Sequence, residues 1–392
     1  MNFDTPFLSL GTDAWTGRPH HIFSKESLMV ITVIFLLIST MTSERVLFKL
    51  IVDRMESYRY FLSQLMTFVY IPPLFCTVGV KATREDLLEH EMTDFPKIRF
   101  LYMGLLDLLH SVLIFMAGGN IAPTLTVLLL QASFPLSTVF EMILNKRIWY
   151  SRVHLIGTAV IILGLGCLFF PSNLILDSPS SLEQTDYTNR LIYLAAMIPG
   201  SASILYKEYA IRNQPMDMVY LNTWVAVYQF VGGLLLAPIF LDLDLLQYQQ
   251  KLSGLECLIN EDSEGSADNC RFGLVLFLLF IACGFSVNLL LVKLVRLTSI
   301  SVTNTTAIMG FVCSFCTLLT YEMTPRVKEF IPTPNWTKAA TSDVVISFVV
   351  IAIGRILYHW YPEPEVEAIT SSAADKESEL LLQDSEAGIK YM

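Results

Sequence analysis

The stretch "FLYMGLLDLLHSVLIFMAGG", residues 100–119, decides the fold. Only Asp107 and His110 interrupt a run of apolar and small residues that is long enough to cross a membrane, because a bilayer core of about 30 Å needs roughly 20 helical residues. The run is continuous and does not alternate with a period of two, so it predicts a helix and not a barrel strand. We therefore expect a transmembrane helix here.

The rest of the chain repeats this pattern. The 392 residues are 53% hydrophobic and 16% charged, which is far more apolar than an ordinary soluble domain. Ten apolar segments follow one another, at 28–50, 58–80, 98–117, 121–143, 149–170, 190–211, 216–241, 272–294, 300–321 and 342–361. They leave little sequence for a soluble domain, so we predict an all-α membrane protein with ten transmembrane helices.

The orientation follows from the positive charges. Ten spans place residues 1–27 and 362–392 on the same side, and a cytosolic position for both tails puts most lysines and arginines on the cytosolic side. We predict no cleavable signal peptide, because about 27 mostly polar residues precede the first span. The net charge of −10 comes without a basic stripe, so nucleic acid is not an expected partner.

Two short motifs agree with this orientation. The sequon "NWT" at Asn335 lies in the lumenal loop between the last two spans, where a glycosylation acceptor must be. The acidic C-terminal tail, which we expect to be disordered, carries Glu377 ahead of Leu381 and Leu382, a pattern that cytosolic sorting adaptors bind. Such adaptors deliver proteins to lysosomes, endosomes and vacuoles.

Two of the seven cysteines lie outside the spans. Cys257 and Cys270 fall in the acidic loop 242–271, which is lumenal in this orientation. A lumenal compartment is oxidising, so we predict a disulfide between them.

The ten spans divide into two groups of five, at 28–170 and 190–361, joined by a lumenal linker at 171–189. The fourth span begins with Thr124-x-Thr126, and the ninth begins with Thr303-x-Thr305 after an equally short link. We therefore expect two inverted repeats around a central cavity, the usual arrangement of a secondary transporter.

Polar and small residues form stripes on three spans, at positions that share one helical face. The stripes consist of Thr124, Gln131, Pro135 and Thr138, of Thr303, Gly310, Ser314 and Thr317, and of Asn222 and Gln229. Such stripes either line a wet cavity or hold helices together in the membrane, and three together favour the cavity.

Charged groups inside spans are expensive, so they normally face a cavity or a partner. Arg45 and Lys49 lie deep in the first span, and Asp107 and His110 lie one turn apart on the third. Lys207, near a cytosolic end, is instead expected to anchor its helix at the interface.

Five stretches resemble one known family in order and spacing. They are "LLD" at 105–107, "LQASFP" at 130–135, "YSRVHLIGTAVIIL" at 150–163, "AAMIPGSASILYKEYAIR" at 195–212 and "LNTWVAVYQF" at 221–230. Together they are similar to the chloroquine-resistance-transporter family of the drug/metabolite transporter superfamily, over nearly all ten spans.

The resemblance implies two inverted five-helix repeats around a cavity that opens to an acidic vacuole or lysosome. It also implies transport of amino acids, small peptides, thiols such as glutathione, or cationic drugs, driven by the proton gradient and the membrane potential. Functional positions of the family match Arg45, Lys49, Asp107, Gln131 and Glu208 here.

The chain departs from the family on the eighth span, where Ser286 and Asn288 replace acidic residues of parasite members. A less acidic cavity puts transport of cationic drugs in doubt. His110 has no counterpart in the family pattern.

These observations predict a proton-coupled secondary transporter of small polar nutrients in a vacuolar or lysosomal membrane, whose partners are its substrate and protons. Asp107, with His110, would exchange protons or pair with cations, and Arg45 would meet a carboxylate. Gln131, Asn222 and Gln229 would orient the substrate. A nucleotide-sugar exchanger of the same superfamily is the alternative, and a receptor or scaffold is a second. No catalytic or metal-binding cluster stands out in the sequence, so neither an enzyme nor a cofactor is expected.

Overall fold

The computed structural model describes residues 25–85, 95–144, 150–169, 181–213, 217–240, 254–259, 272–298, 300–323 and 342–360. All the regular structure in these segments is helical. The helices are α1 (Lys25–Arg54), η1 (Glu56–Tyr58), α2 (Arg59–Glu85), α4 (Lys97–Gly118), α5 (Pro123–Leu129), η2 (Leu130–Ala132), α6 (Ser133–Leu144), α7 (Arg152–Cys167), α8 (Ser181–Asn213), α9 (Met218–Phe240), α11 (Gly273–Leu297), α12 (Ile300–Met323) and α13 (Ser342–His359).

Every predicted span coincides with helical structure, and the fourth span consists of α5, η2 and α6 in succession. Among the described residues, eight helical segments are long and apolar enough to cross a membrane. Of the remaining two spans, α7 has only 16 residues, and α8 has 33 residues but starts with a polar end. The chain is therefore a multi-pass helical membrane protein, while the count of ten spans and the two repeats stay predictions.

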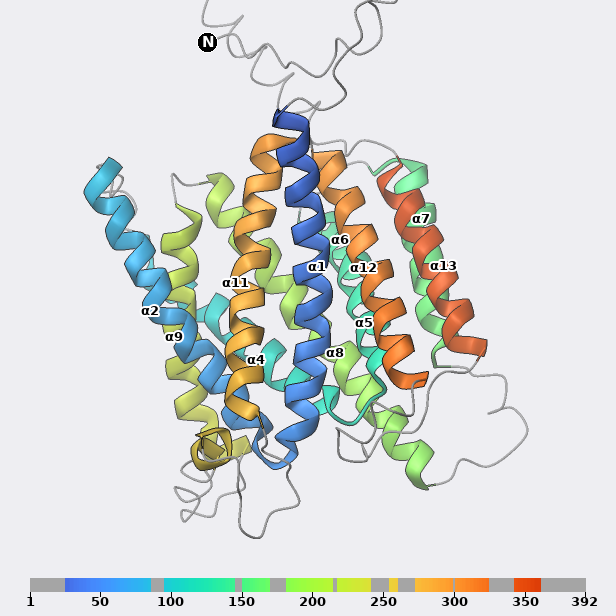
Figure 1. Cartoon of the computed structure of the whole chain (residues 1–392), viewed down its shortest axis with the longest axis horizontal. Helices are drawn as coiled ribbons and strands as arrows, with labels where there is room; N and C mark the ends of the chain where they lie inside the picture. The colour runs from blue at the N-terminus through green and yellow to red at the C-terminus, as the bar shows by residue number, and fades with distance from the viewer. Residues whose placement is uncertain are drawn as a thin grey trace, which may run out of the picture.

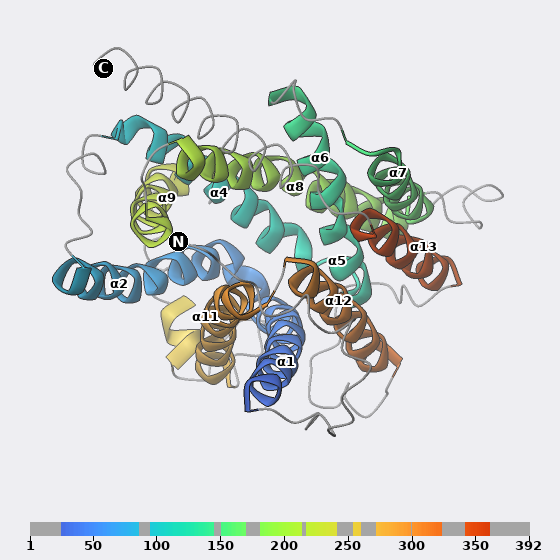
Figure 2. The ribbon, with the colours of Figure 1, turned by 90° about the horizontal axis from the view of Figure 1, so that it is seen from above.

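The helices form an elongated bundle (Figure 1). In the view from above, α11, α1 and α12 line one long side and α8 lies along the other, with α4 and α5 between them (Figure 2). The pair α2 and α9 closes one end of the bundle, and the pair α7 and α13 closes the other (Figure 2).

Several of the contacts between helices repeat across the two halves of the chain. In the first set, α1 packs against α11 and α12, and in the second α8 packs against α4 and α6. Exchanging each span with the one five places later converts the first set into the second. The same exchange leaves the pairs α2 with α9, α5 with α12, and α7 with α13 unchanged.

Close backbone contact holds α7 against α13. A Cβ atom at Gly157 would lie only 2.7 Å from the backbone nitrogen of Tyr358, and one at Gly354 would lie 2.9 Å from the nitrogen of Ile161. Only glycine permits this approach, which is a common way to associate helices in a membrane where the hydrophobic effect does not drive them together.

The fourth span changes its winding where α5 meets α6. The 3₁₀ turn η2 covers Leu130–Ala132, just before Pro135. Proline has no backbone N–H, so the carbonyl group of Gln131 lacks its usual helical donor there. This irregular turn brings Leu130 to the wall of a cavity in the bundle.

Candidate functional site

A cavity of about 350 Å³ lies in the middle of the bundle, mainly between α1, α2, α4, α8 and α9, with single contributions from α5, η2 and α11. Its size falls within the range of small-molecule sites, about 300–1,000 Å³. Its wall mixes aromatic and aliphatic groups with many polar ones. The polar lining residues are Glu44, Arg45, Ser63, Thr67, Tyr70, Asp107, His110, Ser111, Thr126, Tyr193, Lys207, Asn222 and Gln229.

The charged groups of the cavity come in two pairs of opposite sign. Lys207 of α8 forms an ion pair with Asp107 of α4, with Nζ and Oδ2 2.5 Å apart, and both side chains are about 20% exposed. Glu44 and Arg45 are neighbours on α1. The four charges cancel formally, so the cavity suits a molecule that carries both signs better than a polyanion.

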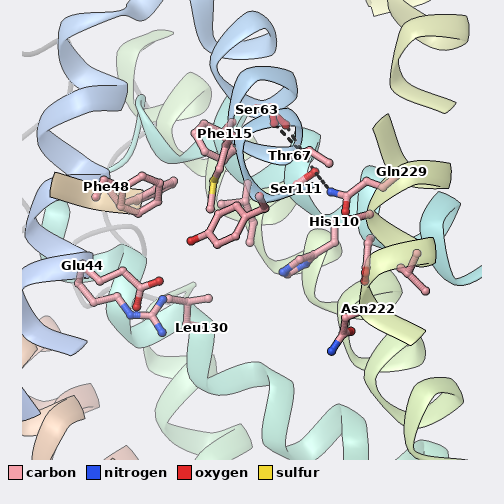
Figure 3. A pocket seen from close by; sticks show the side chains of 18 of the residues that line it. Glu44, Phe48, Ser63, Thr67, His110, Ser111, Phe115, Leu130, Asn222 and Gln229 are labelled. Atoms are coloured by element: carbon pink, nitrogen blue, oxygen red, sulfur yellow. Dashed lines mark hydrogen bonds between the residues drawn. The ribbon is translucent and has the colours of Figure 1, made fainter. Parts of the chain in front are cut away.

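His110 points into the cavity from α4, opposite Glu44 (Figure 3). Its Nδ1 lies 2.6 Å from the carbonyl oxygen of Ala196 on α8. A carbonyl group only accepts hydrogen bonds, so we assign the proton to Nδ1, which leaves Nε2 of the neutral ring free to accept one. Gly200 fixes the ring from behind, because a Cβ there would lie 2.5 Å from Nδ1.

Uncharged polar side chains link three helices along one wall of the cavity. Gln229 of α9 donates from Nε2 to Oγ of Ser111 on α4 at 3.3 Å. The hydroxyl of Ser63 on α2 donates to the same oxygen at 3.4 Å (Figure 3). Asn222 approaches the cavity from the same helix, about two turns before Gln229 (Figure 3). These groups can form hydrogen bonds with a polar solute.

Aromatic rings and a buried cation close one end of the cavity. The ring of Phe48 packs edge-on against Phe115, with centroids 5.2 Å apart. One residue later, Lys49 is almost fully buried and donates to the carbonyl oxygens of Gly118 and Ile121 at 2.9 and 2.8 Å. It satisfies the carbonyl groups at the C-terminal end of α4, where a cation is favoured, and it pairs with Asp53 at 2.8 Å.

The sequence-based candidates therefore divide into two sets. The cavity brings together Arg45, Asp107, His110, Asn222 and Gln229. Six others lie outside its lining: Lys49, Thr124, Gln131, Glu208, Thr303 and Ser314.

The stripe on the fourth span faces other helices. Thr124 donates to Oε2 of Glu322 on α12 at 2.8 Å. Gln131 accepts a hydrogen bond from Nη1 of Arg355 on α13 at 2.8 Å. The stripe on the ninth span behaves similarly, since Ser314 donates to the Gly310 carbonyl within its own helix at 2.7 Å. These contacts correspond to the helix-packing alternative.

Several cavity residues were not singled out as candidates from the sequence. Lys207 was expected at the interface, and the α2 residues Ser63, Thr67 and Tyr70 carried no charge that would draw attention. Their spacing of three, four and seven residues on one face of α2 was the available signal.

Other predictions lie outside the described residues: Cys270, Asn335, Glu377, Leu381 and Leu382. Cys257 is buried on the short helix at 254–259, and its predicted bridge to Cys270 stays a prediction. Within the described residues, no group of three or more histidine, cysteine or carboxylate side chains is placed to hold a metal ion.

The chain resembles known proteins over most of its length. Residues 28–358 match the model of a family described as CRT-like, chloroquine-resistance transporter-like. The chloroquine resistance transporter of Toxoplasma gondii is 33% identical over 52% of this chain and 23% of its own length. Crt homolog 1 of Dictyostelium discoideum is 30% identical over 64% of this chain and 55% of its own length. Protein CLT1, chloroplastic, of Arabidopsis thaliana is 23% identical over 81% of this chain and 70% of its own length. The chain thus spans under a quarter of the length of the Toxoplasma gondii transporter and about half the length of Crt homolog 1.

Proposed function

The chain belongs to the chloroquine-resistance-transporter-like family, and we propose that it is a secondary transporter that carries small zwitterionic nutrients across an acidic vacuolar or lysosomal membrane. Amino acids, small peptides and glutathione-like thiols have this chemistry. The observation that carries the proposal is a cavity in the membrane-spanning bundle that holds two cations and two carboxylates.

The charges give each end of a zwitterion a partner. Arg45 on α1 is suited to a substrate carboxylate, and Asp107 on α4 is suited to an ammonium group. To reach Asp107, an ammonium group must displace Lys207 from its ion pair. The displaced Lys207 would then share the substrate carboxylate with Arg45, so that no charge is left unpaired in the membrane.

Coupling to protons would use the same groups. Asp107 and His110 lie one turn apart on α4, and both line the cavity. A proton on Asp107 would release Lys207, and a proton on Nε2 of His110 would add a positive charge opposite Glu44. Either step changes the affinity for a charged substrate, which is the requirement for coupled transport.

Alternating access would follow from the predicted inverted repeats. The two-fold pattern of helix contacts supports this organisation. Phe48 and Lys49 pack at the end of the cavity that the charge bias predicts to be lumenal, and this supports the inference of a cytosol-facing state. Opening to the lumen would require the Lys49 contacts to the end of α4 to break.

Uptake by the purified full chain in liposomes tests the proposal. We expect accumulation of a labelled amino acid, dipeptide or glutathione that rises with an acid gradient across the membrane. Asp107→Asn should abolish the effect of pH on uptake. Unchanged uptake and pH dependence in this variant would contradict the assigned role.

A second variant isolates His110 without altering it. Gly200→Ala places a methyl group 2.5 Å from Nδ1 and forces the ring away from the Ala196 carbonyl. We expect uptake to shift in its pH profile while the Asp107 and Lys207 pair remains. A pH profile identical to that of the wild type would exclude His110 from coupling.

The same assay separates the alternatives. A nucleotide-sugar exchanger should be inhibited by nucleotide sugars, but its phosphates would meet both Glu44 and Asp107 in this cavity. Ligand binding without accumulation would instead indicate a receptor. The vacuolar or lysosomal location is tested by alanine at Leu381 and Leu382, which should redirect the protein if sorting adaptors bind the tail.

A further inference from the structure

A second cavity, of about 270 Å³, lies between α2 and α9 on the outer side of the bundle. The two faces of α2 separate it from the central cavity. Ser63, Thr67 and Tyr70 face the central cavity, whereas Tyr60, Phe61, Gln64 and Phe68 face the outer one. We call this outer cavity the lateral pocket, and nothing in the proposed transport cycle uses it.

The lateral pocket opens on a lipid-facing surface. Phe68 of α2 and Leu234 of α9 line it and are 50% and 48% exposed. Both lie within candidate membrane spans, so their exposed surfaces meet hydrocarbon. At the other end, the short helix at 254–259 packs against a lining residue of the pocket, since a Cβ at Gly254 would lie 3.0 Å from the ring of Phe61. The exposure of Phe68 and Leu234 thus favours entry of a ligand from the bilayer.

The lining is aromatic and flat. It includes the rings of Tyr58, Tyr60, Phe61, Phe68 and Phe230. Phe68 and Phe230 lie with centroids 5.3 Å apart, and Gly233 adds a stretch of bare backbone. Rigid rings and bare backbone favour a ligand with a flat, rigid apolar body, because such a body loses little conformational freedom on binding. The lining residues Tyr58 and Phe68 are ten residues apart, so the wall of the pocket extends about 15 Å along the helix.

One polar group in this apolar wall has no partner. Gln64 is only 7% exposed, and neither its Oε1 nor its Nε2 has a hydrogen-bond partner among the described residues. Its carboxamide lies against Gly233, where a Cβ would overlap it. The nearby Gly233 carbonyl already accepts from the Tyr60 hydroxyl at 2.6 Å. A water molecule held by Gln64 alone would lack the two to four partners that buried waters need.

From these observations we propose that the lateral pocket binds a membrane sterol, whose hydroxyl group forms a hydrogen bond with Gln64. A sterol combines a flat, rigid hydrocarbon body with a single hydroxyl, which can both donate to Oε1 and accept from Nε2. Binding would satisfy the one unpaired amide of the pocket and fill its aromatic walls. The proposal does not depend on the transported substrate.

Photolabelling of the full chain in lipid nanodiscs tests the proposal, with a diazirine derivative of cholesterol as the probe and mass spectrometry of the labelled peptides. We expect labels on α2 and α9, and about fivefold stronger competition by cholesterol than by its analogue without the hydroxyl group. Leu234→Trp fills the mouth of the pocket and should reduce labelling to background. Leu235→Trp is the matched control, since Leu235 is 74% exposed on the same helix but does not line the pocket.

Gln64→Leu tests the hydrogen bond itself. The substitution removes a buried, unpaired amide and should not destabilise the fold, which a melting curve checks. We expect about fivefold weaker competition by cholesterol, the effect of losing one hydrogen bond, and no remaining preference for the hydroxyl. Equal competition in wild type and variant would overturn the role of Gln64. Labelling by a diazirine fatty acid that Leu234→Trp blocks equally would overturn the sterol assignment in favour of an acyl chain.

Discussion

The ion pair between Asp107 and Lys207 gives the sharpest test of the cavity. Asp107→Asn keeps the shape of the side chain but removes the charge that faces Lys207 at 2.5 Å. Exposed pairs contribute about 0.2–1 kcal/mol, whereas breaking a fully buried pair costs about 3–5 kcal/mol. Because both side chains are about one-fifth exposed, we expect the variant to lose about 2 kcal/mol of unfolding free energy.

A double-mutant cycle separates the structural role from the transport role. Lys207→Gln alone leaves Asp107 without its partner and should also destabilise the protein. The double variant Asp107→Asn with Lys207→Gln removes both charges, so we expect it to recover most of the loss, with a coupling of about 1–3 kcal/mol. Unfolding in mixed micelles, followed by circular dichroism, measures the four free energies of unfolding.

Transport by the double variant then decides the function. If the two charges receive the substrate, the stable double variant should still take it up at least about tenfold more slowly than the wild type, which corresponds to 1.4 kcal/mol. Wild-type uptake with wild-type pH dependence would refute the reasoning, because the pair would then be purely structural. Additive losses of stability, without coupling, would contradict the ion pair itself.

Two further predictions concern the framework around the cavity. Gly157→Ala should lower the free energy of unfolding by about 3 kcal/mol in the same assay, because the new methyl group meets the backbone of Tyr358. Gly166→Ala on the same helix is the control. No atom lies within 4 Å of its added methyl group, so the free energy of unfolding should change by less than about 1 kcal/mol. Asp217 caps α9 and pairs with Lys81 of α2 at 2.7 Å; partial burial raises the pKa of its carboxyl group, but hydrogen bonds from Lys81 and two backbone amides outweigh this and lower it overall. Because the pKa of Asp217 is lowered, its ion pair with Lys81 is present above the ordinary pKa of an aspartate and is lost only as the pH falls through the lowered pKa. The distance between spin labels on α2 and α9 should therefore be the same at about pH 7 and pH 5. In Asp217→Asn the labels should lie further apart at both pH values.

The sequence predicts the helices of this protein well because each one is marked by its own run of apolar residues. Length and hydropathy are local properties, so every predicted span contains a helix. The deep charges of Arg45 and Asp107 also pointed to the cavity, since a charge within a span must find polar surroundings.

The direction in which a polar face points is not a local property. Gln131 and Gln229 are both glutamines on polar stripes, yet Gln131 accepts from Arg355 between helices and Gln229 lines the cavity. The local sequences around Gln131 and Gln229 do not indicate which glutamine lines the cavity, because that depends on which helix packs against each stripe. Lys207 shows the same limit: its place near a helix end suggested the interface, but α4 presents Asp107 at that level.

Under the proposed duplication, the two cations of the cavity have equivalent origins. Arg45 and Lys207 lie at the same distance from the start of the first span of each half, residues 28 and 190, and α1 and α8 have corresponding neighbours. The carboxylate breaks this symmetry. Asp107 on α4 and Ile281 on α11 likewise lie at the same distance from the starts of their spans, residues 98 and 272, and Ile281 is buried in a hydrophobic cluster. Two equivalent cations alone would offer the same site in both access states. Asp107 belongs to one repeat, so it is the group whose surroundings change when the repeats move, and its protonation can therefore be tied to the direction of opening.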